Sequence, residues 1–257
     1  MTKPNEDTRN NWKSILSKSK VYDYTVNPYR GCSNACRYCY AAFMRRFAGH
    51  REPWGEFVDV KINAPDVLAK EIKRKPIGRV WVSGVCDPYQ PAEKKYGLSR
   101  KCLEILLGNN WPVTIQTKSA LVLRDIDTLK TSGQIEVGFS VATAEEKIRR
   151  IFEPGASPIK ERINALQSLH GNGVKTFVMI APLLPGAEKL PDEFAGAADF
   201  VLIDRLNYHY ADHVYRENNL EWAIEDRFFA EKAYELKKGF EREGIPVRTL
   251  FQIASSN

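Results

Sequence analysis

The sequence predicts a single α/β domain built on a parallel sheet, and three observations lead to that fold class. Short β-rich runs alternate with helical patterns along most of the chain, as they do in repeated β/α units. Residues 177–180 and 200–203 are apolar at every position, which is expected of strands covered on both sheet faces. The 257 residues contain no internal linker and no sequence repeat, so we expect one domain.

Seven strands and several helices can be assigned in order. Strands are expected at residues 22–27, 79–83, 113–117, 135–141, 174–181, 200–204 and 247–251, which make six or seven β/α units. The clearest helix has Ser157 as its N-cap, Pro158 at its first position and Gly171 past its end. Other helices are expected at residues 65–75, 99–107, 121–131 and 220–243. We assign residues 1–20 to an N-terminal arm and residues 21–257 to the core, which ends in a helix and a strand.

Composition narrows the class of protein. With 43% hydrophobic and 27% charged residues, the chain is expected to bury a substantial core. The polar N-terminus lacks the apolar segment of a signal peptide, and no stretch approaches the roughly 18 apolar residues of a membrane span, so we expect a cytoplasmic protein without a membrane partner. The net charge of +6 suits nucleic acid or another anionic partner, although the basic residues are interspersed with acids as on ordinary solvated helices.

The cysteines carry the strongest chemical signal. Five cysteines are an odd number, and three of them, Cys32, Cys36 and Cys39, follow the first predicted strand at C-x3-C-x2-C spacing. In a large chain without an export signal, this usage indicates metal or redox chemistry rather than a disulfide framework. Three thiolates can hold a four-iron cluster and leave one iron open to another ligand, whereas a structural zinc site needs four protein ligands.

An alternative is a non-enzymatic zinc module that contacts nucleic acid or protein. It would take its fourth ligand from His50, Cys86 or Cys102, although Cys102 shares a helical face with apolar residues and is expected in the core.

Polar segments follow the other predicted strands as well. They are residues 83–91, 117–119, 140–143, 182–186 and 205–210. Because ligands collect at the carboxyl ends of strands in parallel α/β folds, we expect these segments to surround one site with the cysteines.

The cysteine segment resembles the signature of the radical S-adenosylmethionine (SAM) superfamily, C-x3-C-x-aromatic-C, with Tyr38 at the aromatic position. A closer likeness covers residues 22 to 205 through segments 27–32, 87–93, 153–154 and 181–186, which are similar to the spore photoproduct lyase-like branch of that superfamily. The resemblance implies a partial barrel of the triosephosphate isomerase type with six β/α units, in agreement with the strand assignment.

The resemblance also implies a reaction. A 4Fe-4S cluster on the three cysteines would chelate SAM, and an electron from a reductant such as flavodoxin or ferredoxin would cleave it to a 5'-deoxyadenosyl radical. That radical would take a hydrogen atom from a substrate, for which the branch favours nucleic acid, in a lyase or modification reaction. The alternative keeps the same chemistry on a peptide or a cofactor precursor. Only Cys86 and Cys102 remain outside the trio, too few for a second cluster.

Roles for other residues follow from the same resemblance. Tyr38 is expected to approach the adenine through its backbone, Lys118 to meet the SAM carboxylate, and Ser140 to bond the ribose or the methionine end. Asp87 lies in a proline-rich loop expected over the cofactor, with turn formation as its alternative. Cys86 is a candidate hydrogen-atom donor to the product radical, with a small buried thiol as its alternative.

Overall fold

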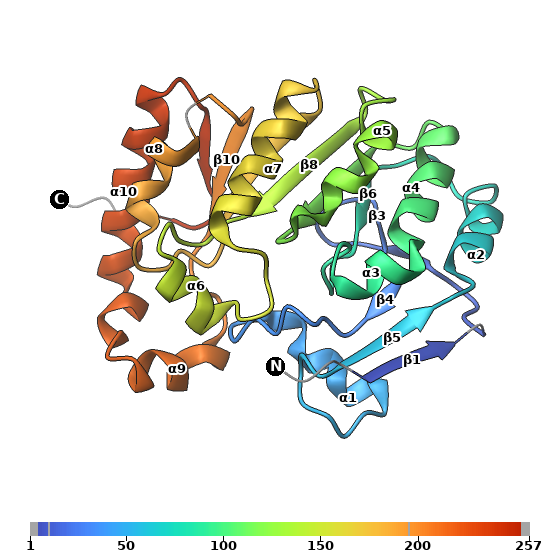
Figure 1. Cartoon of the computed structure of the whole chain (residues 1–257), viewed down its shortest axis with the longest axis horizontal. Coiled ribbons are helices and arrows are strands. Elements are labelled where there is room, and N and C mark those ends of the chain that lie inside the picture. The colour runs from blue at the N-terminus through green and yellow to red at the C-terminus, as the bar shows by residue number, and fades with distance from the viewer. Residues whose placement is uncertain (1–4, 10, 195, 253–257) are drawn as a thin grey trace.

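The computed structural model describes residues 5–9, 11–194 and 196–252, and its central element is an eight-stranded sheet (Figure 1). The strand order is β11-β10-β9-β8-β7-β6-β3-β2, and all neighbours pair in parallel except β2 with β3. The order ends at β2 on one side and at β11 on the other, so the barrel is open. The strands are β2 Leu16–Lys18, β3 Tyr24–Val26, β6 Val80–Val82, β7 Val113–Thr117, β8 Ile135–Ser140, β9 Lys175–Ile180, β10 Phe200–Ile203 and β11 Val247–Thr249.

The predicted α/β class and its parallel sheet are confirmed, and each of the seven predicted strands is found within its expected range. The helices cover the outer face of the sheet in chain order, from α2 at one edge to α10 at the other (Figure 1). They are α1 Arg45–Ala48, α2 Ala64–Glu71, α3 Pro91–Tyr96, α4 Leu98–Gly108, α5 Ile126–Leu129, α6 Glu146–Phe152, α7 Ile159–Gly171, α8 Leu190–Phe194, α9 Asp212–Glu217 and α10 Asp226–Arg242. Shorter 3-10 helices are η1 Tyr40–Met44, η2 Ala120–Asp125, η3 Ala187–Lys189, η4 His209–Ala211 and η5 Glu221–Ile224.

Three helix predictions need correction. The N-cap of α7 is Pro158, because the Ser157 hydroxyl instead accepts a hydrogen bond from the backbone of Ala120 at 3.3 Å, and Gly171 is the last helical residue. The helix predicted at residues 220–243 is interrupted at Glu225, whose extended backbone (φ −76°, ψ 145°) separates η5 from α10. The helix predicted at 121–131 is η2 followed by α5, since its first turns are 3-10.

A second, smaller sheet was not predicted. It consists of β1 Asn5–Arg9, β5 Phe57–Lys61 and β4 Tyr29–Arg30, with β1 parallel and β4 antiparallel to β5. Gly31 follows β4 with φ 89°, and a Cβ at this position would lie 2.3 Å from the carbonyl oxygen of Phe57. Only glycine permits this approach, which directs the chain from β4 into the cysteine loop.

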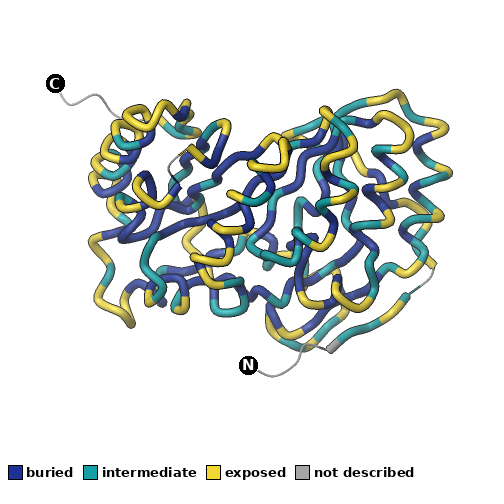
Figure 2. The backbone as a smooth tube through the Cα atoms, turned by 45° about the horizontal axis from the view of Figure 1, so that its top comes forward, coloured by how far each residue is buried: buried dark blue, intermediate teal, exposed yellow. Residues whose placement is uncertain are grey.

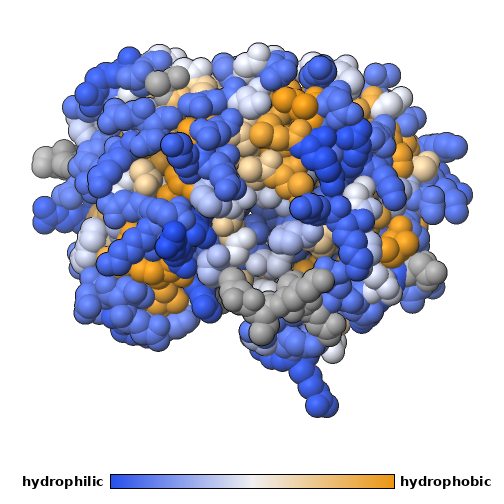
Figure 3. Space-filling view, in the orientation of Figure 1, coloured by the Kyte–Doolittle hydropathy of each residue, from blue (hydrophilic) through white to orange (hydrophobic). Residues whose placement is uncertain are grey.

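The buried residues are concentrated along the central sheet. Figure 2 shows the strands buried and the outer sides of the helices exposed, and Cys102 lies fully buried in the core as predicted. The face in Figure 3 is mostly hydrophilic, with apolar residues in separate patches. Within the described ranges, no helix combines the length and apolar character needed to cross a bilayer.

Candidate active site

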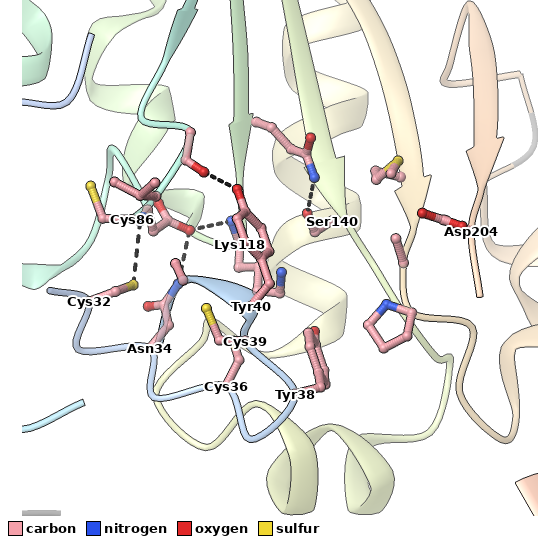
Figure 4. A pocket seen from close by; sticks show the side chains of 18 of the residues that line it. Cys32, Asn34, Cys36, Tyr38, Cys39, Tyr40, Cys86, Lys118, Ser140 and Asp204 are labelled. Carbon is pink, nitrogen blue, oxygen red and sulfur yellow. Dashed lines mark hydrogen bonds between the residues drawn. The ribbon is translucent and has the colours of Figure 1, made fainter. Parts of the chain in front are cut away.

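A cavity of about 260 Å³ opens at the carboxyl ends of the parallel strands, between them and the cysteine loop, residues 31–40 (Figure 4). Each of the five strand-end segments predicted from the sequence contributes some of its residues to the cavity lining. These residues lie at the carboxyl ends of β6, β7, β8, β9 and β10. All eight candidate residues line the cavity: Cys32, Cys36, Tyr38, Cys39, Cys86, Asp87, Lys118 and Ser140. Tertiary structure therefore brings together residues separated by more than one hundred positions.

The three cysteines of the loop are free thiols on the side of the cavity that faces the strand ends (Figure 4). Burial raises the pKa of each thiol, and that of Cys36 reaches about 12. Three thiols of one loop that share one cavity can hold a four-iron cluster and leave one iron open, whereas a structural zinc site needs a fourth protein ligand.

The three residues that could supply a fourth zinc ligand, His50, Cys86 and Cys102, have other partners or surroundings. His50 Nε2 is 2.7 Å from the carboxylate of Asp59 in the smaller sheet, and Cys102 is in the core on α4. Cys86 lines the cavity, but its Sγ contacts the backbone oxygen of Tyr29 at 3.5 Å. The cysteine loop therefore supplies three candidate thiol donors beside the cavity.

The cysteine loop rests on the segment that follows α6. The Arg37 N–H donates to the carbonyl of Phe152 at 2.8 Å, and the Gly155 N–H donates to the carbonyl of Asn34 at 3.0 Å. A Cβ on Gly155 would lie 2.2 Å from the carbonyl oxygen of Ser33. This close backbone contact requires glycine and supports the cysteine loop on the segment that follows α6.

Glu153 connects the loop to the barrel through a buried charge network. Its Oε1 accepts a hydrogen bond from the hydroxyl group of Tyr38 and lies 3.8 Å from Lys118 Nζ. Its Oε2 lies 2.6 Å from Arg162 Nη1. Arg162 also donates to the carbonyl of Ser140 at 2.9 Å. Burial by itself would raise the pKa of Glu153, but Arg162 and Lys118 outweigh it and hold that pKa below its ordinary value.

Sequence reasoning missed this network. Glu153 was noticed only as part of a motif, and Arg162 lies on the buried face of α7, where a charged residue is rare unless it is paired. That position on a helix face was the signal available in the sequence.

Lys118 is the cation of the cavity wall. Its side chain is 15% exposed, and its ammonium lies 5.7 Å from the centre of the Tyr38 ring. Burial lowers the pKa of this lysine, but the nearby Cys36 and Glu153 more than compensate and raise it above its ordinary value. A protonated ammonium at this place can bind a carboxylate ligand.

Asp87 braces the cavity. Its carboxylate accepts hydrogen bonds from Asn34 Nδ2 at 2.9 Å, from Thr117 Oγ1 at 2.7 Å and from the backbone N–H groups of Tyr89 and Lys118 at 2.9 and 2.7 Å. Its own N–H donates to Cys32 Sγ at 3.4 Å. These bonds join the cysteine loop to the end of β7.

Ser140 and Cys86 lie on different sides of the cavity. The Ser140 Oγ accepts a hydrogen bond from Gln116 Nε2 at 2.9 Å, which leaves its own proton for another acceptor. Burial raises the pKa of Cys86 to about 12. In Figure 4 the Cys86 sulfur lies at the side of the cavity away from Ser140 and Asp204, next to a small apolar cluster that includes Tyr29.

Tyr40 and Tyr208 lie at the rim of the cavity, and Tyr210 stacks on Tyr208 beside it. The rings of Tyr40 and Tyr208 are stacked with centroids 6.2 Å apart, and those of Tyr208 and Tyr210 are stacked at 5.8 Å. Tyr208 is 50% exposed and Tyr210 is 47% exposed. His209 lies between Tyr208 and Tyr210 in the chain and is an exposed histidine whose Nδ1 is 3.1 Å from the carboxylate of Asp212.

Comparison with known proteins agrees with this arrangement. A profile described as the radical SAM superfamily matches residues 26–200. An uncharacterized protein of Methanocaldococcus jannaschii is 36% identical over 206 residues, which are 76% of this chain and 77% of that protein. A radical SAM Nalpha-GlyT isomerase of Pseudomonas phage M6 is 23% identical over 163 residues, 63% of this chain and 33% of the isomerase.

Among solved structures, spore photoproduct lyase complexed with a dinucleoside spore photoproduct superimposes with a TM-score of 0.70 at 18% identity. The match covers 95% of this chain and 82% of the lyase, so the two proteins share their fold.

Proposed function

The chain belongs to the radical SAM superfamily and is an enzyme, and we propose that it cleaves SAM reductively and abstracts a hydrogen atom from a nucleic-acid substrate. The observation that carries this proposal is the arrangement of three thiols and one largely enclosed ammonium around a single cavity at the strand ends. A redox-active group and the carboxylate of SAM would thus be held side by side.

Cys32, Cys36 and Cys39 would hold a 4Fe-4S cluster. The cavity in front of the three thiols supports that assignment over structural zinc, because a four-iron cluster held by three cysteines leaves one iron open to a further ligand. When bound and reduced by a carrier such as flavodoxin or ferredoxin, the cluster supplies the electron that breaks SAM into methionine and the 5'-deoxyadenosyl radical.

The protein's own groups would bind and orient SAM. Lys118 would pair with the carboxylate, because its raised pKa keeps the ammonium charged in a buried site. Ser140 would donate a hydrogen bond from its hydroxyl group to the ribose or the methionine end of SAM. The Tyr38 backbone would approach the adenine. Asp87 and Glu153 would position these groups, since each joins the cysteine loop to the strand ends. Cys86 would reach the product radical only after its side chain turns from the Tyr29 carbonyl.

Three observations support nucleic acid as the substrate class. The lyase that shares this fold was captured with a dinucleoside photoproduct. The rim of the cavity presents stacked and exposed tyrosine rings, which suit the faces of nucleobases. The net charge of +6 favours a polyanion.

Anaerobic reconstitution with iron and sulfide, followed by dithionite and SAM, tests the chemistry. We expect about four irons per chain and formation of 5'-deoxyadenosine, and we expect the Cys36→Ala variant to lose both. Reconstituted protein that holds its iron yet forms no 5'-deoxyadenosine would contradict the proposal. Stoichiometric zinc in protein purified without added metal would favour the zinc module instead.

Substrate class is tested in the same assay with deuterated oligonucleotides. Transfer of deuterium from the oligonucleotide into 5'-deoxyadenosine is expected, because the radical takes its hydrogen atom from the substrate. Deuterium transfer from a peptide, and none from any oligonucleotide, would contradict the nucleic-acid proposal while leaving the radical chemistry intact.

A further inference from the structure

The segment from Arg37 to Arg51 continues from the cysteine loop, and apart from Tyr38 and Cys39 the proposed chemistry does not use its side chains. It contains η1 and α1, and we call it the Arg-aromatic segment. Phe47 is 68% exposed and Phe43 is 42% exposed, which is unusual for side chains this apolar. The segment also exposes four arginines, Arg37, Arg45, Arg46 and Arg51.

None of the four arginines takes part in an ion pair between described residues. Arg45 instead donates to the backbone oxygen of Arg51 at 2.6 Å. Four exposed arginines within fifteen residues give this part of the chain a locally basic character.

The backbone of the segment is held in place by a different arginine. Arg30 of β4 donates to the carbonyls of Phe47 at 3.0 Å and Ala48 at 3.4 Å. The same guanidinium is paired with the fully buried Asp59 of β5. The smaller sheet thereby anchors the segment, and the exposed side chains project from a defined scaffold.

The Arg-aromatic segment is continuous with the rim of the cavity. Its 3-10 helix begins at Tyr40, which lines the cavity and stacks on Tyr208, and Tyr208 stacks on Tyr210. The rings of Phe43 and Phe47, which follow Tyr40 in the chain, contact each other with centroids 6.3 Å apart.

We infer that the Arg-aromatic segment binds an unpaired nucleic-acid strand and leads it to the cavity. Arginines that contact phosphates, interleaved with aromatic rings on which bases stack, are the combination that single-stranded nucleic acid requires. An acidic protein partner, such as an electron carrier, would use the arginines but would have less use for the exposed phenylalanines. The inference rests on the proposed nucleic-acid substrate and adds the surface that recognises it.

Fluorescence anisotropy with a short labelled single-stranded DNA tests the inference on the full reconstituted chain. R46E/R51E is the variant of choice, because neither side chain makes a hydrogen bond to another described residue. Its affinity should fall about tenfold or more, and the slope of log K against log salt should shrink by about 1.4, the value for two phosphate contacts on a single strand. F47A should weaken binding about tenfold with an unchanged salt slope, because a stacking contact releases no counterions.

The matched control is K237E/K238E on α10, which makes the same change of charge at two exposed lysines far along the chain. It should lower affinity by less than about threefold. Equal losses in both double variants, or wild-type binding by R46E/R51E, would overturn the inference. So would R46E/R51E that binds DNA normally but loses SAM cleavage with flavodoxin while keeping it with dithionite, because the surface would then serve the electron carrier.

The SAM cleavage assay with dithionite separates this inference from the proposed function. Wild-type protein that binds DNA through the segment but forms no 5'-deoxyadenosine would contradict the proposed chemistry alone. Wild-type protein that forms 5'-deoxyadenosine but binds no single strand would contradict the inference alone.

Discussion

The two sides of the cavity are built in different ways. The side made by the cysteine loop and the ends of β6, β7 and β8 is buried and tied together by side-chain hydrogen bonds, with Asp87 and Glu153 as the main connections. The side made by the ends of β9 and β10 continues into residues 204–210, where Tyr208 and Tyr210 are half exposed and contact each other mainly through their rings.

This difference indicates a division of labour. A cofactor with fixed geometry needs donors that are already in place, and the buried network supplies them without further ordering. A substrate is recognised by loops and exposed rings that can differ between related enzymes on the same scaffold. The first side is therefore expected to govern SAM cleavage, and the second side is expected to govern substrate choice.

The largest effect should come from breaking the buried network at Glu153. Glu153→Ala leaves Arg162 and Lys118 without their carboxylate, and removal of one partner of a buried ion pair costs about 3–5 kcal/mol. We expect that loss in the free energy of unfolding, measured by urea denaturation, together with a lower iron content. Glu231→Gln, which removes an exposed ion pair with Arg227, should cost less than about 1 kcal/mol. Equal losses in the two variants would contradict the comparison of the two sides.

Lys118→Met tests the cofactor side without dismantling it. Methionine fills a similar volume but cannot pair with a carboxylate, and a hydrogen bond to a charged group contributes about 1.5–3 kcal/mol. SAM affinity, measured by isothermal titration on the reconstituted protein, should therefore fall by about ten- to hundredfold with iron content unchanged. Unchanged affinity would show that Lys118 serves only the pair with Glu153.

Tyr208→Ala tests the substrate side. Loss of one stacking ring should raise the KM for an oligonucleotide substrate about tenfold. SAM cleavage in the absence of substrate should stay at the wild-type rate, since the ring lies at the rim. Tyr234→Ala, at an equally exposed ring on α10, is the control and should change neither quantity. A loss of SAM cleavage in Tyr208→Ala would remove the proposed division between the two sides.

Cys86→Ala should have the smallest effect on SAM cleavage. The thiol lies on the side of the cavity away from Asp204, and its sulfur contacts the Tyr29 carbonyl rather than the residues proposed to bind SAM. We expect 5'-deoxyadenosine formation within about twofold of wild type, and a changed distribution of substrate-derived products if the thiol donates a hydrogen atom. Product analysis by mass spectrometry decides this: an unaltered distribution would assign Cys86 to packing alone.

Much of the fold was predictable because its signals are local. Each parallel strand is a short apolar run bounded by turn residues, so all seven were located from the sequence. The smaller sheet was not predicted, because β4 has two residues and β5 carries Asp59 and Lys61 within an otherwise apolar run. The interruption at Glu225 was also missed, since a charged residue gives no local sign of an extended backbone.

For the site, the sequence by itself located the candidate cluster ligands. The spacing of Cys32, Cys36 and Cys39 is a short-range property of one loop, and the strand-end positions of Asp87, Lys118 and Ser140 follow from strand assignment. Only the tertiary structure decided which groups these residues contact. Glu153 and Arg162 act through partners distant in the chain, and their burial depends on how α7 packs against the sheet. The direction of the Cys86 sulfur and the stacking of Tyr40 on Tyr208 were decided in the same way, because side-chain contacts between distant segments exist only after the chain has folded.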